Sequence, residues 1–220
     1  MIMPYAQLGA FERVSRVSKQ ALSLAPRIND PALLAYLYRA VTHMFIEQHR
    51  FAEALSYADK AMRLSEQLNV AGDVGLCRLA SGAALMDADR LAEAADEFAE
   101  AVKIFESCGA PSYAARAVAG LAEAQLRQGN AAQARQLART IAEIDPWTTA
   151  YLNRIAAQAA AECGDPGEAE LRFGRSAALF EAQGGRSDLI ETCREWARLL
   201  VRQGRLAEAC EVYNRGLILT

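Results

Sequence analysis

The sequence predicts an all-α protein made of repeated pairs of antiparallel helices, and three observations carry this expectation. The chain of 220 residues is 52% hydrophobic and 23% charged, and it holds only 6 prolines and 14 glycines. This composition favours helix throughout and supplies apolar surface for a core. Small residues recur at an almost constant spacing, and turn-tolerant residues precede them at a fixed distance. The length suits one domain or one uninterrupted repeat array.

The small residues form a column that defines the repeat. Two helices that cross closely each need a small residue at the crossing, and bulkier neighbours fill the space that is left. The spacings between successive members of this anchor column are 40, 40, 40, 35 and 40. The anchor residues are Val14, Ala54, Ala94, Ala134, Ala169 and Ala209.

A second column predicts where the first helix of each pair ends. It lies five residues before each anchor and holds residues that can take or approach the left-handed conformation that stops a helix. Its members are Gly9, His49, Asp89, Gly129, Gly164 and Gly204. After the second helix, Pro26 and Pro146 cannot continue a helical segment.

These columns predict about eleven helices and no β-sheet, arranged in one repeat array over residues 1–220. A partial pair occupies residues 1–26, where Tyr5–Gly9 is the tail of a first helix whose start is absent. The extra residues of the long repeat are expected at the junctions Asn69–Asp73, Ser107–Pro111 and Gln183–Ser187. The full pairs are expected at about 31–68, 72–108, 112–146, 147–183 and 187–220.

Several segments carry a resemblance to a known family. They are Tyr5–Gly9 with Pro26, Gln128–Asn130 with Ala134 and Pro146, and the run Arg202–Tyr213. In these residues the chain resembles the tetratricopeptide repeat (TPR) family along essentially its whole length. It departs from the family pattern at Val14, Gln125 and Ala160.

The 40-residue period is longer than the usual repeat of about 34 residues. The segments Ala101–Ala110 and Ala178–Gly184 resemble the longer repeats of bacterial regulators with TPR sensor domains, of the maltose-regulator, ATPase-linked and helix-turn-helix types. The resemblance implies a right-handed superhelical solenoid. Its first helices would line a concave groove, in which a partner would bind.

Groove-facing positions follow by counting back from each anchor in steps of about one helical turn. They hold seven arginines against five acidic residues, and the excess lies near the C-terminus. We expect ligand or partner contacts from Tyr36, Arg39, His43, Arg116, Glu123, Arg127, Tyr151, Arg154, Gln158, Arg194, Arg198 and Arg202.

The last three of these arginines form one stripe with i, i+4, i+8 spacing. Two interpretations are open. Glu162, Glu191 and Glu195 could neutralise the stripe as an ordinary charged helix face. Alternatively, the stripe binds an acidic or carboxylate-bearing ligand together with Arg154, because the planar guanidinium can hold a carboxylate with two hydrogen bonds.

Other classes of function find no support in the sequence. The net charge of −3 gives no general attraction to nucleic acid, no stretch of about 18 apolar residues could span a membrane, and no secretory signal is present. The five cysteines form no Cys-x-x-Cys motif, so we expect reduced thiols in a cytosolic protein, four of them inside helices. No catalytic, nucleotide-binding or metal-binding motif occurs, so we expect no enzyme, cofactor or metal.

The sequence therefore favours a non-catalytic binding module that recognises a protein, peptide or small ligand in its groove. It would be the sensor or interaction part of a bacterial transcriptional or signalling regulator in the cytoplasm, without direct binding to nucleic acid or membranes. Both ends look uncapped, which indicates either a segment excised from a longer protein or ends covered by homo-oligomerisation. The alternatives are a freestanding scaffold or assembly factor that self-associates, and a non-catalytic segment of a multidomain signalling ATPase or cyclase.

Overall fold

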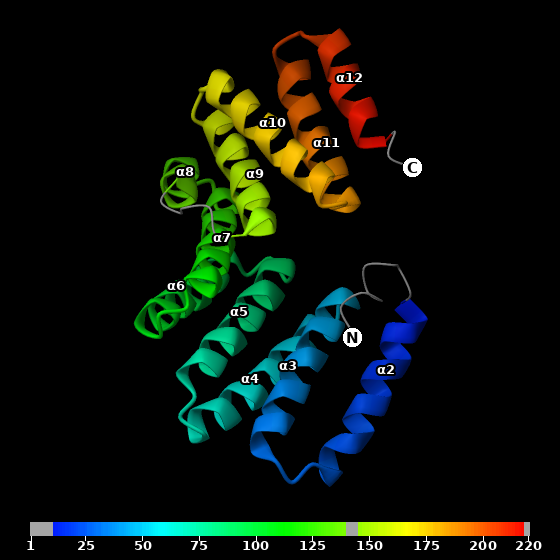
Figure 1. The fold of residues 1–220 in the computed structure, drawn as a ribbon, viewed down its shortest axis with the longest axis vertical. Coiled ribbons are helices and arrows are strands. Elements are labelled where there is room, and N and C mark those ends of the chain that lie inside the picture. Colours follow the sequence, from blue (N-terminus) through cyan, green and yellow to red (C-terminus); the bar gives the residue numbers. More distant parts are fainter. Residues whose placement is uncertain (1–10, 140–144, 218–220) are drawn as a thin grey trace. The chain divides into compact units, whose positions relative to one another are not determined.

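The computed structural model describes residues 11–139 and 145–217, and it is all-α as predicted (Figure 1). These residues form eleven α-helices and one short 3₁₀ helix, with no strand among them. The tail of a first helix expected at Tyr5–Gly9 lies outside the described residues. The helices are α2 Phe11–Leu24, η1 Ala25–Arg27, α3 Pro31–Glu47, α4 Phe51–Gln67, α5 Ala71–Asp87, α6 Leu91–Ser107, α7 Pro111–Arg127, α8 Ala131–Arg139, α9 Pro146–Glu162, α10 Pro166–Ala182, α11 Arg186–Arg202 and α12 Leu206–Leu217.

The helix lengths explain the long repeat. Helices α4, α5, α6 and α7 have 17 residues each, and three residues separate each of them from the next helix. The second helices of neighbouring pairs therefore begin at Phe51 and Leu91, which reproduces the period of the anchors. The one shorter spacing falls where α9 follows α8, because α8 begins at Ala131 and α9 already begins at Pro146. The extra residues of the repeat therefore lengthen the helices and not the junctions, because the turn between pairs has three residues, like the turn within a pair.

The turns use the predicted left-handed residues. His49 has φ 55° and Asp89 has φ 59°, and the described glycines of the same column lie between 76° and 84°. At the end of α3, the N–H of Arg50 donates to the carbonyl of Phe45 at 2.9 Å, and the N–H of His49 donates to Ile46 at 2.8 Å. This is the hydrogen-bond pattern in which a left-handed residue satisfies the last carbonyls of a helix. The turn column is therefore confirmed wherever the structure describes it.

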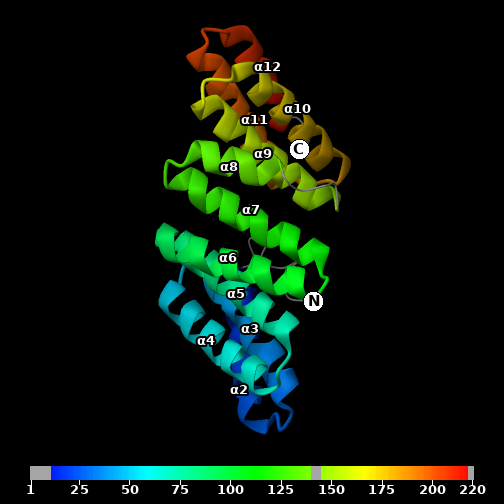
Figure 2. The same cartoon turned by 90° about the vertical axis from the view of Figure 1, so that its left-hand side faces the viewer.

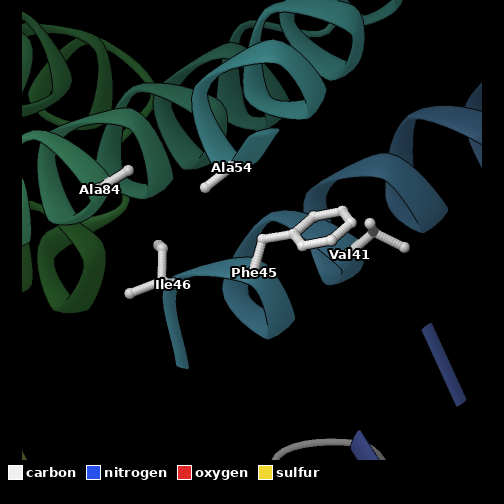
Figure 3. Packing of buried hydrophobic residues seen from close by; sticks show 5 residues of the cluster. All are labelled: Val41, Phe45, Ile46, Ala54 and Ala84. Carbon is white, nitrogen blue, oxygen red and sulfur yellow. The ribbon is translucent and has the colours of Figure 1, made fainter. Parts of the chain in front are cut away.

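The chain divides into two compact units, residues 1–120 and 121–220, and the boundary falls inside α7. In the first unit, α3 and α4 pack together, as do α5 and α6. The first core cluster comprises Val41, Phe45, Ile46, Ala54 and Ala84 (Figure 3). The anchors Ala54 and Ala94 are fully buried, as the crossing-point interpretation requires.

In the second unit, each helix from α8 to α11 packs against the helix that follows it (Figures 1 and 2). The anchors Ala134 and Ala169 are again fully buried, and Ala209 is 4% exposed. Phe173 of α10 fills the space beside Ala157, Ala160 and Leu199. The single array over residues 1–220 and its right-handed coiling stay predictions.

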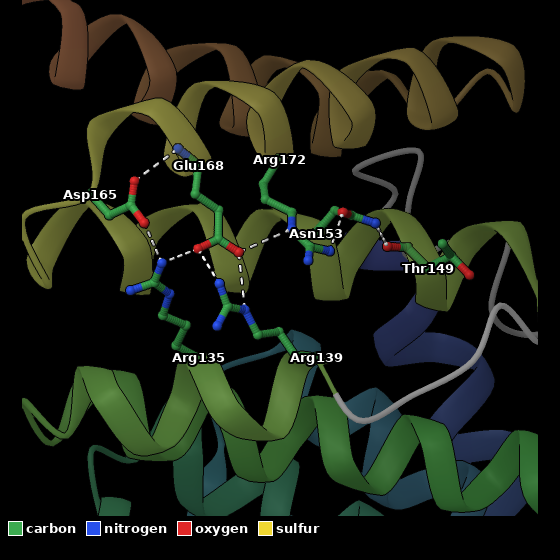
Figure 4. A network of polar contacts seen from close by, with 7 residues as sticks. All are labelled: Arg135, Arg139, Thr149, Asn153, Asp165, Glu168 and Arg172. Atoms are coloured by element: carbon green, nitrogen blue, oxygen red, sulfur yellow. Dashed lines mark hydrogen bonds and ion pairs between the residues drawn. The ribbon is translucent and has the colours of Figure 1, made fainter.

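A polar network links α8, α9 and α10 in this unit (Figure 4). Arg135 and Arg139 of α8 both donate to the carboxylate of Glu168 on α10. Arg135 also reaches Asp165, whose side chain caps the start of α10. These guanidinium hydrogen bonds lower the pKa of Glu168 to about 2. The network holds α8 to α10 through charge-assisted hydrogen bonds.

The cysteines correct one expectation. Cys77, Cys193 and Cys210 lie inside helices, whereas Cys108 and Cys163 are the C-cap residues directly after α6 and α9. The number inside helices is therefore three and not four, because Cys108 and Cys163 each lie in the turn after a helix. All five thiols are free, and burial raises the pKa of Cys77 and of Cys193.

Candidate binding groove

The second unit contains a cavity of about 1250 Å³ between α7, α9, α11 and α12. This volume exceeds that of a typical small-molecule pocket, which is about 300–1,000 Å³. The apolar part of its lining comprises Leu126, Ala161, Phe173, Ala197, Val201, Leu206, Ala209, Cys210 and Tyr213. The charged part comprises Glu123, Arg127, Glu162, Arg194, Glu195, Arg198 and Arg202.

Helical periodicity explains why these charges meet. Residues four apart on a helix share one face, so the groove positions form one row on each of α7, α9 and α11. Six of the twelve residues expected to contact a partner line the cavity: Glu123, Arg127, Gln158, Arg194, Arg198 and Arg202. Their roles in binding stay predictions, but the structure brings them to one cavity.

Tyr151 and Arg154 of α9 do not line the cavity. The Tyr151 hydroxyl donates to the carboxylate of Glu123, which ties α9 to α7. Burial, together with the charge of Glu123, raises the pKa of Tyr151. Arg154 lies over the Tyr151 ring at 4.8 Å from its centroid and bonds Asp188 of α11 at 3.5 Å. Both side chains thus hold the first helices of the groove together.

Carboxylates neutralise two of the three arginines in the stripe. Arg194 bonds Glu191 at 2.8 Å and lies 3.5 Å from Glu195, and Arg198 bonds Glu195 at 2.6 Å. Arg202 has no ion pair within the described residues, and its side chain is exposed. The neutral interpretation of the stripe therefore holds for Arg194 and Arg198, and the uncompensated charge is at Arg202.

The remaining expected contacts lie in the first unit and form a separate group. Tyr36 of α3 is 60% exposed, and Arg39 lies over its ring at 5.5 Å from the centroid. His43 follows one turn later, and burial followed by the charges of Arg116 and Arg39 lowers its pKa.

Two features of the second unit escaped the sequence analysis. Leu206 and Tyr213 of α12 form one wall, although the family resemblance placed the groove on first helices alone. The pairing of Arg154 with Asp188 was also missed. The exposed apolar end of the repeat array was the signal that could have revealed the wall.

Comparisons with known proteins bear on the fold. A scan against protein-family models and a search of curated proteins give no match. Among solved structures, the chain is similar to TPR-like repeats of a Podosopora anserina protein described as a kinesin light chain, with TM-score 0.64 and 16% identity over 87% of this chain and 96% of that one. The fold is that of a TPR-like repeat protein.

Two further solved structures are similar to the chain. The Rap conjugation gene regulator of plasmid pLS20, solved in complex with the Phr* peptide, has TM-score 0.66 and 15% identity over 98% of this chain and 69% of that one. Aspartyl phosphate phosphatase F from Bacillus subtilis has TM-score 0.68 and 10% identity over 98% of this chain and 67% of that one. At these identities the likeness shows the fold alone, which is the fold that the sequence resemblance implied.

Two further observations concern the described part of the chain. No group of three or more histidine, cysteine, aspartate or glutamate side chains there could hold a metal ion. No helix in the same residues is both long enough and apolar enough to cross a membrane.

Proposed function

We propose that this chain is a non-catalytic binding module that holds a peptide segment of a partner protein in the cavity of the second unit. The observation that carries the proposal is the cavity itself, which is larger than a small-molecule pocket and combines an apolar wall with a charged row. A structural neighbour solved with a peptide supports this class of ligand. The proposed setting is the sensor or interaction part of a bacterial cytoplasmic regulator.

The lining indicates the chemistry of the peptide. Val201, Leu206 and Tyr213 are 52%, 61% and 47% exposed, so apolar side chains of a ligand would remove their surface from water. Arg202 would donate charge-assisted hydrogen bonds to a carboxylate of the ligand. The expected partner is therefore an amphipathic segment with an acidic residue beside its apolar face.

A peptide selected from a random display library provides the probe for this proposal. Its affinity is then compared between the wild-type chain and the variants Val201→Asp and Arg202→Ala, both at exposed positions. Val201→Asp is expected to weaken binding at least tenfold. Arg202→Ala should cost about 1.5–3 kcal/mol for a lost charged hydrogen bond, with a smaller loss at high salt.

The matched control is Leu171→Asp on α10, where the leucine is 72% exposed and outside the cavity. It should leave the affinity unchanged. The double variant Arg194→Ala and Arg198→Ala should keep the fold and weaken binding less than Arg202→Ala, because carboxylates already pair with both arginines. Selected peptides that bind Val201→Asp and Arg202→Ala as tightly as the wild type would place the site elsewhere.

A second candidate function is a self-associating scaffold. It is favoured by the exposed apolar residues of α12, where Leu206 is 61% and Leu217 is 42% exposed. Light scattering distinguishes the two proposals, because a scaffold would form dimers without any peptide. A monomer that binds the selected peptide supports the binding module instead.

A further inference from the structure

The three first helices that line the cavity of the second unit each end in a charged residue. Arg127 is the last residue of α7, Glu162 of α9 and Arg202 of α11. All three line the cavity, and each lies seven residues before the anchor of its pair. The helix ends that border the cavity therefore carry two positive charges and one negative charge.

The negative member of this column is in an unfavourable position. Carbonyl groups without partners give the C-terminal end of a helix a partial negative charge, which favours a cation there and disfavours a carboxylate. Arg127 and Arg202 follow this preference in the last turns of α7 and α11. The last turn of α9 contains no basic residue, and Glu162 is its last residue. Without a ligand, Glu162 therefore lowers the stability of α9.

No side chain of the described residues compensates this carboxylate. Glu162 is exposed, and it has neither a hydrogen bond nor an ion pair within that part of the chain. The other two carboxylates of the lining are engaged, because Glu123 accepts a hydrogen bond from Tyr151 and Glu195 bonds two arginines of α11. Glu162 of α9 and Arg202 of α11 are therefore both open to a ligand.

The two open charges belong to neighbouring first helices. Helix α9 contacts α11 directly, and Arg154 of α9 bonds Asp188 of α11 at 3.5 Å. Apolar residues directly precede both charges in the sequence, Ala161 on α9 and Val201 on α11, and they also line the cavity. One bound segment can therefore contact the apolar wall and both charges.

We propose that Glu162 is a specificity-determining residue of the cavity, which selects a basic side chain in the bound peptide while Arg202 binds an acidic one. This inference rests on the proposed function and deepens it, because it gives the peptide residues of both charges beside its apolar face. A lysine or arginine of the peptide would donate charge-assisted hydrogen bonds to the Glu162 carboxylate. The same cation would offset the unfavourable charge at the end of α9.

The proposal predicts that stability and binding respond in opposite directions to one substitution. Glu162→Gln removes a carboxylate from a helix C-terminus, so it should raise the melting temperature of the free chain by about 1–3 °C. The same variant loses the charge that binds the basic side chain, so its affinity for the peptide should fall about three- to tenfold. A carboxylate that only stabilises the fold would not give this combination.

The probe is a peptide selected against the wild-type chain from a random display library, together with versions in which one basic residue at a time is replaced by glutamate. Glu162→Lys should bind the original peptide at least tenfold more weakly than the wild type does. One of the glutamate versions should bind Glu162→Lys more tightly than it binds the wild type, because the two charges are then exchanged. Fluorescence anisotropy of the labelled peptides measures the affinities, and the differences should shrink at high salt.

Glu47→Lys is the matched control. Glu47 is the exposed last residue of α3, and the last turn of this helix also contains no basic residue. It occupies the same column of the repeat but lies in the first unit, outside the cavity. Glu47→Lys should therefore raise the melting temperature as Glu162→Lys does, and it should leave the affinity for the peptide unchanged.

The outcomes separate this proposal from the function on which it rests. Selected peptides that depend on Val201 and Arg202, but bind both Glu162 variants as tightly as the wild type, overturn the proposal and leave the peptide site in place. Peptides that bind all of these variants like the wild type, or a library without binders, overturn both. A fall in the melting temperature of Glu162→Gln also overturns the proposal, because the fold itself would then need the carboxylate.

Discussion

Gly120→Ala is expected to destabilise the protein, although the same replacement inside a helix usually stabilises it. A Cβ at Gly120 of α7 would lie 2.6 Å from Cε1 of Phe98 and 2.7 Å from its Cζ. A Cβ at Gly82 of α5 would lie 2.7 Å from the same Cε1. Phe98 is 5% exposed, so its ring is held between two glycines and cannot move away from one without meeting the other.

The magnitude follows from two opposing contributions. Replacing glycine by alanine in a helix stabilises by about 1 kcal/mol, because the unfolded chain loses freedom. Overpacking a filled core costs about 1–3 kcal/mol. With the Phe98 ring trapped, the second contribution should exceed the first. The free energy of unfolding should fall by about 1–2 kcal/mol, which lowers the melting temperature by about 2–4 °C per kcal/mol for a chain of this size.

Chemical denaturation followed by far-ultraviolet circular dichroism measures the effect. The matched control is Gly174→Ala in α10, where the Cβ would lie 3.6 Å from Cη2 of Trp196, an ordinary contact. This variant should gain up to about 1 kcal/mol. In a Phe98→Ala background, Gly120→Ala should also become stabilising, because the ring that opposes it is gone. The reasoning is refuted if Gly120→Ala raises the denaturation midpoint as Gly174→Ala does.

Three other variants test the packing and the polar network. Ala94→Leu and Ala134→Leu each place bulk at a fully buried crossing and should cost about 1–3 kcal/mol of unfolding free energy, and an unmoved denaturant midpoint would mean that the register is wrong. Arginine neighbours hold the pKa of Glu168 at about 2, below its unfolded value of about 4.3, so its stabilising contribution is present above that value and is lost as the pH falls towards 2. Glu168→Gln should therefore flatten the fall of the melting temperature on acidification, and an unchanged slope would show that other carboxylates control it.

The sequence could predict the core because the core is built from repeated columns. Ala54 and Ala94 are small for the same reason, which is the crossing of two helices, so one pattern covers many positions. His49 and Asp89 are harder to recognise than glycine as left-handed residues, yet their place in the column predicted the turn. The length of the repeat is regular for the same reason, because each turn between consecutive helices from α3 to α8 and from α9 to α12 has three residues.

The groove was less predictable because each of its charges has its own surroundings. The spacing of Arg194 and Arg198 predicts that they share one face of the helix. It does not predict whether a carboxylate already forms an ion pair with each guanidinium. Glu195 serves both of them, whereas Arg202 is left without an ion pair in the described residues. The rotamer of each arginine and the side chains of the neighbouring helix decide whether it forms an ion pair. The repeat period predicts neither of them.

One pattern in the sequence distinguishes arginines that form structural ion pairs from arginines that remain available to a ligand. Arg39 bonds Asp73 in the first unit, and Arg154 bonds Asp188 in the second. The two arginines occupy equivalent positions of their repeats, counted from the anchor that follows each of them, and the two aspartates do the same. Because the same ion pair recurs in two separate units, we infer that it has one structural role. An arginine on the first helix of one pair bonds an aspartate near the start of the first helix of the next pair. Such arginines are already engaged in the fold. The arginines that are most available to a ligand are therefore those outside these ion pairs, Arg116 in the first unit and Arg202 in the second.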